Sequence, residues 1–188
     1  MYLTALLSRW TWRDRRSRFA TFARAELSSR YDLLAAANLT SDPAVAARLL
    51  QHAADEARHA RLFYTRAVEL GERAPLRADY ERLYERLGER RFFAFVHLGE
   101  ARAVRQFETW IRWLGPGKDQ RALQAVLPDE ARHAAYTRAL AGSLKEAALW
   151  EAGRGWLRAG RAMTGAVYRA LCVALYVLLG PLGVGLRT

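Results

Sequence analysis

The feature that most constrains this chain is a hexapeptide, Asp-Glu-Ala-Arg-His-Ala, that occurs twice, at residues 55–60 and 129–134. Each copy contains Glu-x-x-His. Thirty residues before the glutamate of each motif lies another glutamate, Glu26 for the first copy and Glu100 for the second. The chain therefore carries two sets of Glu, Glu and His with the same internal spacing.

The spacing within each motif suits a metal ion bound to one face of a helix. Residues three apart in a helix lie on the same face with Cβ atoms about 5–6 Å apart, so Glu56 and His59 can bind one ion together. The same holds for Glu130 and His133. Two helical hairpins packed face to face would place four carboxylates and two imidazoles around a pair of ions. The repeat therefore predicts a dinuclear metal site inside a helical bundle.

The composition favours an all-α fold. Ala, Leu, Arg and Glu dominate residues 10–70, where Gly and Pro are sparse, and these are strong helix formers. The sequence predicts four long helices and a short helical stretch between the second and third. Their expected ranges are 12–37, 43–70, 79–87, 90–114 and 118–144.

Local signals mark the ends of these helices. Ser41 or Asp42 is expected to cap the second helix, with Pro43 in its first turn. Gly71 is a plausible stop for that helix, and Gly-Pro-Gly at 115–117 is the sharpest turn signal in the chain. The link at 71–89 is long enough to cross the bundle, whereas the two hairpin loops are short.

Each long helix carries an apolar stripe at helical period with a carboxylate in its middle. These carboxylates are Glu26, Glu56, Glu100 and Glu130. An unpaired carboxylate in an apolar core is costly and would normally be neutralised or replaced. Four of them converging with two histidines indicate a compensating cation.

At these residues the chain resembles the ferritin-like di-iron carboxylate superfamily, which includes rubrerythrins, ferritins and di-iron oxygenases. Its hallmark is one glutamate from each of two helices and Glu-x-x-His from each of the other two. The resemblance covers roughly residues 19–144. It implies a four-helix bundle of two antiparallel hairpins joined by a crossover and a site for two iron ions, with Mn/Fe as a variant. The six implied metal ligands are Glu26, Glu56, His59, Glu100, Glu130 and His133.

The resemblance also implies separate roles for the ligands. Glu56 and Glu130 would bridge the two ions, while Glu26 and Glu100 would each bind one ion as terminal ligands. His59 and His133 would bind one ion each.

Further residues near the motifs are candidates for supporting roles. Asp55 and Asp129 precede the motif glutamates and are natural acceptors for an imidazole N–H, which would fix the tautomer of a ligand. His97 and His52 lie one turn before Glu100 and Glu56, and each is an accessory site residue or a hydrogen-bonded core histidine. Pro128 removes a backbone hydrogen bond beside the site and is expected either to kink the fourth helix or to be accommodated.

The ends of the chain differ from its middle. We expect an apolar and aromatic segment at 1–11, the metal-binding bundle at 12–145 and a C-terminal helical extension at 146–188. Residues 170–186 carry no charge, but a membrane span needs about twenty apolar residues. This tract is expected to pack on the bundle, to lie in a membrane interface or, least favoured, to span a membrane.

The net charge of +11 comes almost entirely from arginine, since Lys118 and Lys145 are the only lysines. The arginines are scattered through the helices, and no nucleic-acid-binding signature accompanies them, so nucleic acid is not an expected partner. A basic surface would suit an acidic ferredoxin-type electron donor or an anionic membrane. The single cysteine, Cys172, cannot form an intrachain disulfide. We expect a cytoplasmic protein. Two questions stay open from the sequence: whether it attaches to the inner face of a membrane, and whether it forms a homodimer.

Three classes of function compete. The first is a di-iron oxidase or monooxygenase that activates O₂ and acts on a small, apolar organic substrate. The second is iron or peroxide handling of the rubrerythrin or ferritin kind, and the third is a metal-stabilised structural or binding protein. Two histidines with four glutamates match the ligand set of the oxygenases, and the chain has no Cys-rich iron module of the rubrerythrin type. The first class is therefore preferred.

Overall fold

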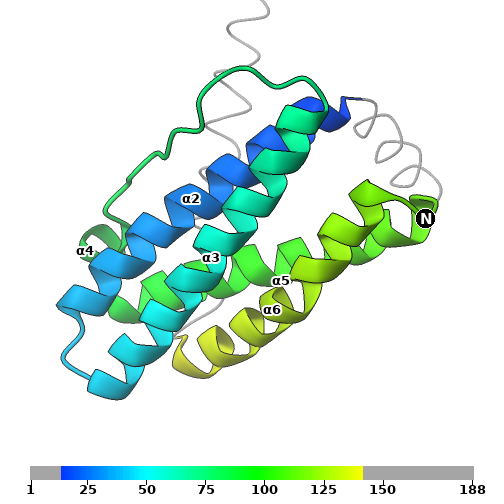
Figure 1. The fold of residues 1–188 in the computed structure, drawn as a ribbon. Coiled ribbons are helices and arrows are strands. Elements are labelled where there is room, and N and C mark those ends of the chain that lie inside the picture. The colour runs from blue at the N-terminus through cyan, green and yellow to red at the C-terminus, as the bar shows by residue number, and fades with distance from the viewer. Residues whose placement is uncertain (1–13, 142–188) are drawn as a thin grey trace, which may run out of the picture. The chain divides into compact units, whose positions relative to one another are not determined.

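The computed structural model describes residues 14–141 and consists of four long helices and one short one (Figure 1). The helices are α2 (Arg15–Leu39), α3 (Pro43–Glu69), α4 (Leu83–Leu87), α5 (Glu89–Trp113) and α6 (Lys118–Leu140). Helices α2 and α3 form one hairpin, and α5 and α6 form the other. The all-α prediction and its two hairpins are confirmed. The expected segments 1–11 and 146–188 lie outside the described residues, as does the uncharged tract at 170–186.

Capping side chains fix where the first hairpin begins and turns. Asp14 accepts a hydrogen bond from the Ser17 backbone N–H at 3.0 Å and starts α2. Of the two predicted caps for the next helix, Asp42 is the one used. Its carboxylate accepts from the backbone N–H groups of Ala44 and Val45 at 2.8 and 3.3 Å, which satisfies donors that have no partner within the helix.

The link between the hairpins returns along the first hairpin. Gly71 follows α3 with a φ of +98°, a conformation that glycine adopts without strain. From there the chain runs from the end of α3 back to α4, close to the start of α5 (Figure 1). The Ser28 hydroxyl on α2 accepts from the Asp79 backbone N–H at 2.9 Å and holds this link in place.

A buried carboxylate on α2 anchors the short helix α4. Asp32 is buried and accepts a hydrogen bond from the Leu83 backbone N–H at 3.0 Å. Leu83 is the first residue of α4, so Asp32 satisfies a helix donor from a distant part of the sequence. The expected short helix at 79–87 is therefore confined to Leu83–Leu87 and begins where this hydrogen bond is made.

Aromatic side chains fill the core beside the predicted metal ligands. Phe63 follows His59 by one helical turn and is fully buried. Its ring lies 5.9 Å from that of Phe19 on α2 and 5.8 Å from that of Phe107 on α5, measured between centroids. Trp110 is also buried against this group. Rings from three helices thus close one side of the site to water.

Helix α6 continues through Pro128 from Lys118 to Leu140. The proline therefore does not end the helix. The helix ends four residues earlier than expected, because Ala141 is extended and the helix-disfavouring Gly142 follows. Among the described residues, no helix is long and apolar enough to cross a membrane.

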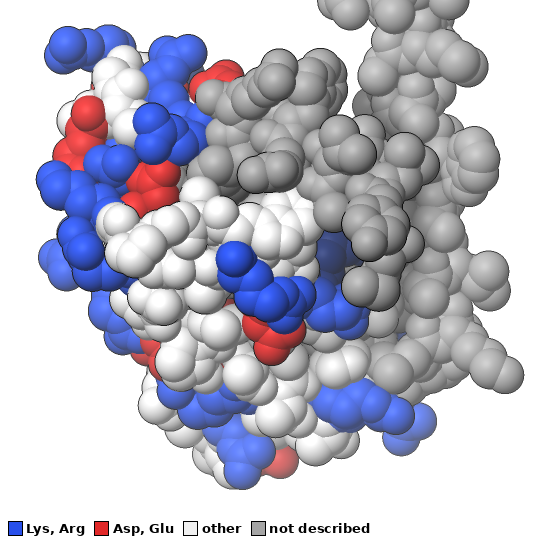
Figure 2. Space-filling view, turned by 90° about the vertical axis from the view of Figure 1, so that its right-hand side faces the viewer, with Lys and Arg blue, Asp and Glu red and all other residues white. Residues whose placement is uncertain are grey.

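Basic side chains are spread over the surface of the described part. Figure 2 shows lysine and arginine side chains on several parts of one face, interspersed with acidic ones. This distribution agrees with the scatter of arginine along the sequence.

Candidate metal centre

The two hairpins bring seven ionisable side chains together in the core. They form two groups of four, and within each group one oxygen or nitrogen atom from every residue lies within 4.8 Å of the others. The first cluster is Glu26, Glu56, His59 and Glu130, and the second cluster is His52, Glu56, Glu100 and His133. All six residues singled out in the sequence are present, and His52 joins them. Glu56 belongs to both clusters.

In the first cluster, His59 on α3 faces Glu130 on α6. The distance between His59 Nδ1 and Glu130 Oε1 is 3.0 Å, and the same nitrogen lies 4.0 Å from Glu56 Oε1. Glu26 on α2 is partly buried, and burial together with the neighbouring Glu56 raises its pKa. Three helices therefore supply the four side chains of this cluster.

In the second cluster, two histidines stack on each other. The rings of His52 and His133 lie 3.6 Å apart between centroids at 28°. The distances to Glu56 Oε1 are 3.0 Å from His52 Nε2 and 3.4 Å from His133 Nδ1, and His52 Nε2 lies 3.4 Å from Glu100 Oε1. Glu130 of the first cluster lies near enough to Glu100 to add to the effect of burial in raising its pKa, so the two clusters also adjoin at these glutamates.

The buried atoms that point into this centre have no hydrogen-bond partners. They are His52 Nε2, Glu56 Oε1, His59 Nδ1, Glu130 Oε1 and His133 Nδ1. Buried polar atoms without partners are rare and costly in native proteins. Imidazole nitrogens and carboxylate oxygens are ligands for Fe(II), Mn(II) and Zn(II). The arrangement therefore fits bound metal ions, which would satisfy all five atoms.

Each motif histidine is held by the aspartate of the opposite hairpin. His59 Nε2 lies 3.2 Å from Asp129 Oδ2, and His133 Nε2 lies 3.2 Å from Asp55 Oδ2. A carboxylate can only accept, so each Nε2 carries a proton, and in the neutral imidazole Nδ1 then presents its lone pair to the cluster. A histidine that binds a metal through one ring nitrogen usually donates a hydrogen bond from the other. Here each of these hydrogen bonds joins α3 to α6.

The arginines of the two hexapeptides bind the same two aspartates. Arg58 donates to Asp55 at 2.8 Å and also to Asp129, while Arg132 donates to Asp55 at 2.6 Å and to Asp129 at 2.7 Å. Burial opposes charge on Asp129, but the hydrogen bonds from His59 and the arginines prevail and lower its pKa to about 2. The pKa of Asp55 is lowered in the same way. Both carboxylates therefore stay ionised as acceptors.

The cluster carboxylates have strongly perturbed pKa values. Burial is the largest cause of the raised pKa values of Glu26 and Glu100 and raises that of Glu56 to about 8. Burial opposes charge on Glu130, but the neighbouring Glu100, His59 and His133 favour its ionised form and lower its pKa. Protons therefore neutralise part of the buried negative charge wherever a cation does not.

The second cluster also contains neutral imidazoles. Burial lowers the pKa values of both His52 and His133 to about 4. At neutral pH these rings are uncharged, as a metal ligand must be. His52 Nδ1 lies 2.6 Å from the hydroxyl of Tyr136, so this third histidine also has a partner on its second nitrogen.

His97, the other candidate accessory residue, is outside both clusters. Its Nδ1 donates to the backbone carbonyl of Ala134 at 2.9 Å. It therefore ties α5 to α6 as a hydrogen-bonded histidine, the alternative weighed for it from the sequence.

Sequence reasoning missed the roles of two arginines. The hydrogen bonds of Arg58 and Arg132 were not predicted, although both arginines occupy the same position in the repeated hexapeptide, which was an available signal. Tyr136, three residues after His133, is a candidate hydrogen-bonding group from the sequence, but its pairing with His52 depends on how α3 packs against α6.

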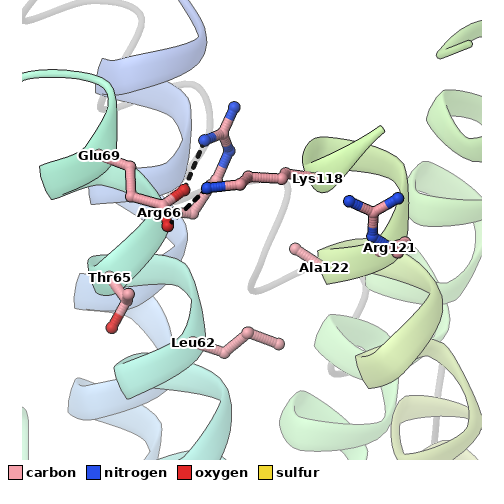
Figure 3. A pocket seen from close by; sticks show the side chains of 7 residues that line it. All are labelled: Leu62, Thr65, Arg66, Glu69, Lys118, Arg121 and Ala122. Carbon is pink, nitrogen blue, oxygen red and sulfur yellow. Dashed lines mark hydrogen bonds and ion pairs between the residues drawn. The ribbon is translucent and has the colours of Figure 1, made fainter. Parts of the chain in front are cut away.

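Two cavities lie between α3 and α6. One, of about 210 Å³, reaches the second cluster, and its wall includes His52, His133, Arg48, Gln51, Arg132 and Tyr136. The other, of about 230 Å³, lies among residues of the late turns of α3 and the first turns of α6 (Figure 3). Its lining includes neither cluster, and Glu69 there pairs with both Arg66 and Lys118. The first cavity is therefore the one that leads to the candidate centre.

Comparisons of the chain with protein-family models, curated proteins and solved structures give no significant match. The fold and the site themselves define the class of protein. The described part of the chain is an all-helical bundle of two hairpins with overlapping, buried clusters of histidine and glutamate that could hold metal ions.

Proposed function

We propose that this protein is a ferritin-like di-iron carboxylate oxidoreductase that uses O₂ to oxidise or hydroxylate a small organic substrate. The observation that carries the proposal is the position of Glu56 between two clusters whose buried atoms lack partners. A carboxylate has two oxygen atoms and can bridge two ions, so overlapping clusters suit a dinuclear centre better than two separate sites.

The ligand set follows from the two clusters. The first cluster, of Glu26, Glu56, His59 and Glu130, would hold one ion, and the second cluster, of His52, Glu56, Glu100 and His133, would hold the other, with Glu56 common to both. Four ionised glutamates carry four negative charges, which two divalent cations would balance. The two ions would then differ in nitrogen ligands, with one histidine at the first and two at the second.

The rest of the chain would prepare the centre for redox chemistry. When bound, two Fe(II) ions would supply electrons for the reduction of O₂. Asp55 and Asp129 hold two imidazoles with their Nδ1 lone pairs toward the centre. The aromatic core around Phe63 keeps water from one side, and the cavity beside Tyr136 gives a small molecule access from another.

The test is anaerobic loading with Fe(II), followed by a pulse of O₂ and by optical and Mössbauer spectroscopy. We expect two irons per chain, both oxidised in one coupled event. We expect Glu56→Ala and His133→Ala to abolish stoichiometric loading. Glu108→Ala, which removes an exposed glutamate of α5, is the control and should load normally.

Two results would count against this function. Unchanged loading in both ligand variants would remove the assigned ligands from consideration. Rapid formation of a mineral containing many irons per chain would favour iron handling of the ferritin kind instead.

A further inference from the structure

The cavity between α3 and α6 offers more than a route to the candidate centre. Arg48, Gln51, His52 and Asp55 line it from α3, and Arg132 and Tyr136 line it from α6. At its inner side His52 and His133 are almost fully buried, whereas Arg48 and Gln51 are exposed. A ligand in the cavity would thus have the second cluster at one end and the Arg48 side chain at the other.

Among residues 14–141, the charges around the cavity leave the Arg48 cation without a partner. Asp55 and Arg132 are paired at 2.6 Å, and with Arg58 and Asp129 they form a network of two carboxylates and two guanidinium groups. Arg48 makes no ion pair with any residue of the described part of the chain. Its guanidinium is therefore available to an anionic group, and a carboxylate is the planar anion that fits two of its N–H donors.

Tyr136 adds a neutral hydrogen-bond donor. If His52 Nε2 is to bind a metal ion, the proton of this imidazole must sit on Nδ1. That Nδ1–H then donates to the Tyr136 oxygen at 2.6 Å. The tyrosine's own proton is left to donate elsewhere, and Tyr136 lines the cavity.

The volume of the cavity limits the size of its ligand. It measures about 210 Å³, below the range of roughly 300–1,000 Å³ usual for drug-sized ligands. A single ring or a short chain bearing one anionic group would fit.

We propose that this cavity binds the substrate of the metal centre and that the substrate is a small organic carboxylate, bound through its carboxylate by Arg48 and through a hydrogen bond by Tyr136. Its carbon body would lie against His52 and His133, next to the second cluster. The assignment as substrate rests on the function proposed above, whereas the carboxylate-binding cavity does not. The sequence analysis expects a small, apolar substrate, and the cavity adds to this expectation one carboxylate group.

The test is isothermal titration calorimetry of the full chain with benzoate, and with benzamide as a neutral ligand of nearly the same shape. Inorganic phosphate distinguishes an organic carboxylate site from a general anion site. Each titration is made on the metal-free and on the Zn(II)-loaded chain, because a carboxylate could also bind zinc directly. We expect one benzoate per chain in both forms, with benzamide and phosphate at least about tenfold weaker.

Variants locate the binding site. Arg48→Gln should weaken benzoate about tenfold and remove its advantage over benzamide, because a charge-assisted hydrogen bond is lost. Tyr136→Phe should weaken it by a smaller factor. Arg61→Gln is the matched control, since Arg61 is another exposed arginine of α3 that does not line the cavity. Circular dichroism would check that each variant is folded.

Several results would overturn the inference. They are equal affinity for benzoate and benzamide, binding of phosphate as tight as that of benzoate, equal loss in Arg48→Gln and Arg61→Gln, or no saturable binding. Metal content is measured separately by mass spectrometry. A chain that binds benzoate through Arg48 but takes up no metal would refute the proposed function and leave the carboxylate site standing.

Discussion

His52 and His97 each lie about one turn before a glutamate of the clusters, four residues before Glu56 and three before Glu100, yet their surroundings differ. His52 Nε2 lies 3.0 Å from Glu56 Oε1 and has no hydrogen-bond partner, whereas His97 Nδ1 is bonded to a backbone carbonyl. A histidine aimed at a carboxylate cluster and one that joins two helices should respond differently to the same substitution.

We therefore expect His52→Ala to weaken the binding of one of the two metal ions by at least about tenfold, through loss of a ligand nitrogen. His97→Ala should bind both ions with wild-type affinity. Competition with a chromophoric chelator for Co(II) or Zn(II) would measure both steps. Equal behaviour of the two variants would contradict the assignment of His52.

The sequence predicted the residues of the centre better than their contacts. The repeated motif identified six side chains because helical spacing alone puts Glu and His of one motif on one face. It could not identify His52 as their companion, since Val126 occupies the equivalent position of the second repeat. The pairing of each aspartate with the histidine of the other motif depends on how α3 packs against α6. The spacing of residues within one helix does not predict this packing.

At the scale of the elements, α4 is held in place by Asp32 on α2. Burial raises the pKa of Asp32, while hydrogen bonds from the backbone of the link oppose this. Because its folded-state pKa lies above the unfolded value, the fold favours the protonated carboxyl. Its stabilising effect is thus complete below the usual pKa of aspartate and is lost as the pH rises through the raised value.

Asp32→Asn keeps an oxygen acceptor for the Leu83 N–H and cannot ionise. We expect it to gain stability relative to wild type as the pH is raised from about 4 to 7.5. Asp32→Ala should lose about 1–3 kcal/mol at both pH values, because a buried donor is left without a partner. Urea unfolding followed by circular dichroism would measure both differences. A falling relative stability of Asp32→Asn over the same pH range would refute the account.

The long helices were easier to predict than the connection between the hairpins. Periodic apolar residues and strong caps such as Asp42 set α3 within one residue of its expected end. The link at 71–82 has few local signals, and its path follows from tertiary hydrogen bonds to Ser28 and Asp32. Such contacts join residues about fifty positions apart and leave no periodic trace in the sequence.

At the scale of the whole molecule, metal binding and folding should be linked. The centre places buried carboxylates against one another, and their raised pKa values show that the fold disfavours their charge. Ions that bind the folded chain and not the unfolded one stabilise it by mass action, by about 2.7 kcal/mol at one hundred times the dissociation constant.

We therefore expect the melting temperature of the metal-loaded chain to exceed that of the chelator-treated chain by about 5–10 °C, since each kcal/mol is worth about 2–4 °C for a chain of this size. Differential scanning calorimetry at matched pH would measure the shift. The Glu56→Ala variant should show little shift on metal addition, and a full shift in that variant would mean that stabilisation arises at another site.

The crossed pairing of aspartate and histidine between the hexapeptides bears on the symmetry of this architecture. Neither hairpin is self-sufficient, because each imidazole finds its carboxylate on the other one. Two identical copies of a single hairpin, related by a twofold axis, would meet the same requirement reciprocally. The chain thus has the layout that a symmetric dimer of one such hairpin would have if its two subunits were joined, and His52, whose equivalent is Val126, makes the two halves of the centre unequal.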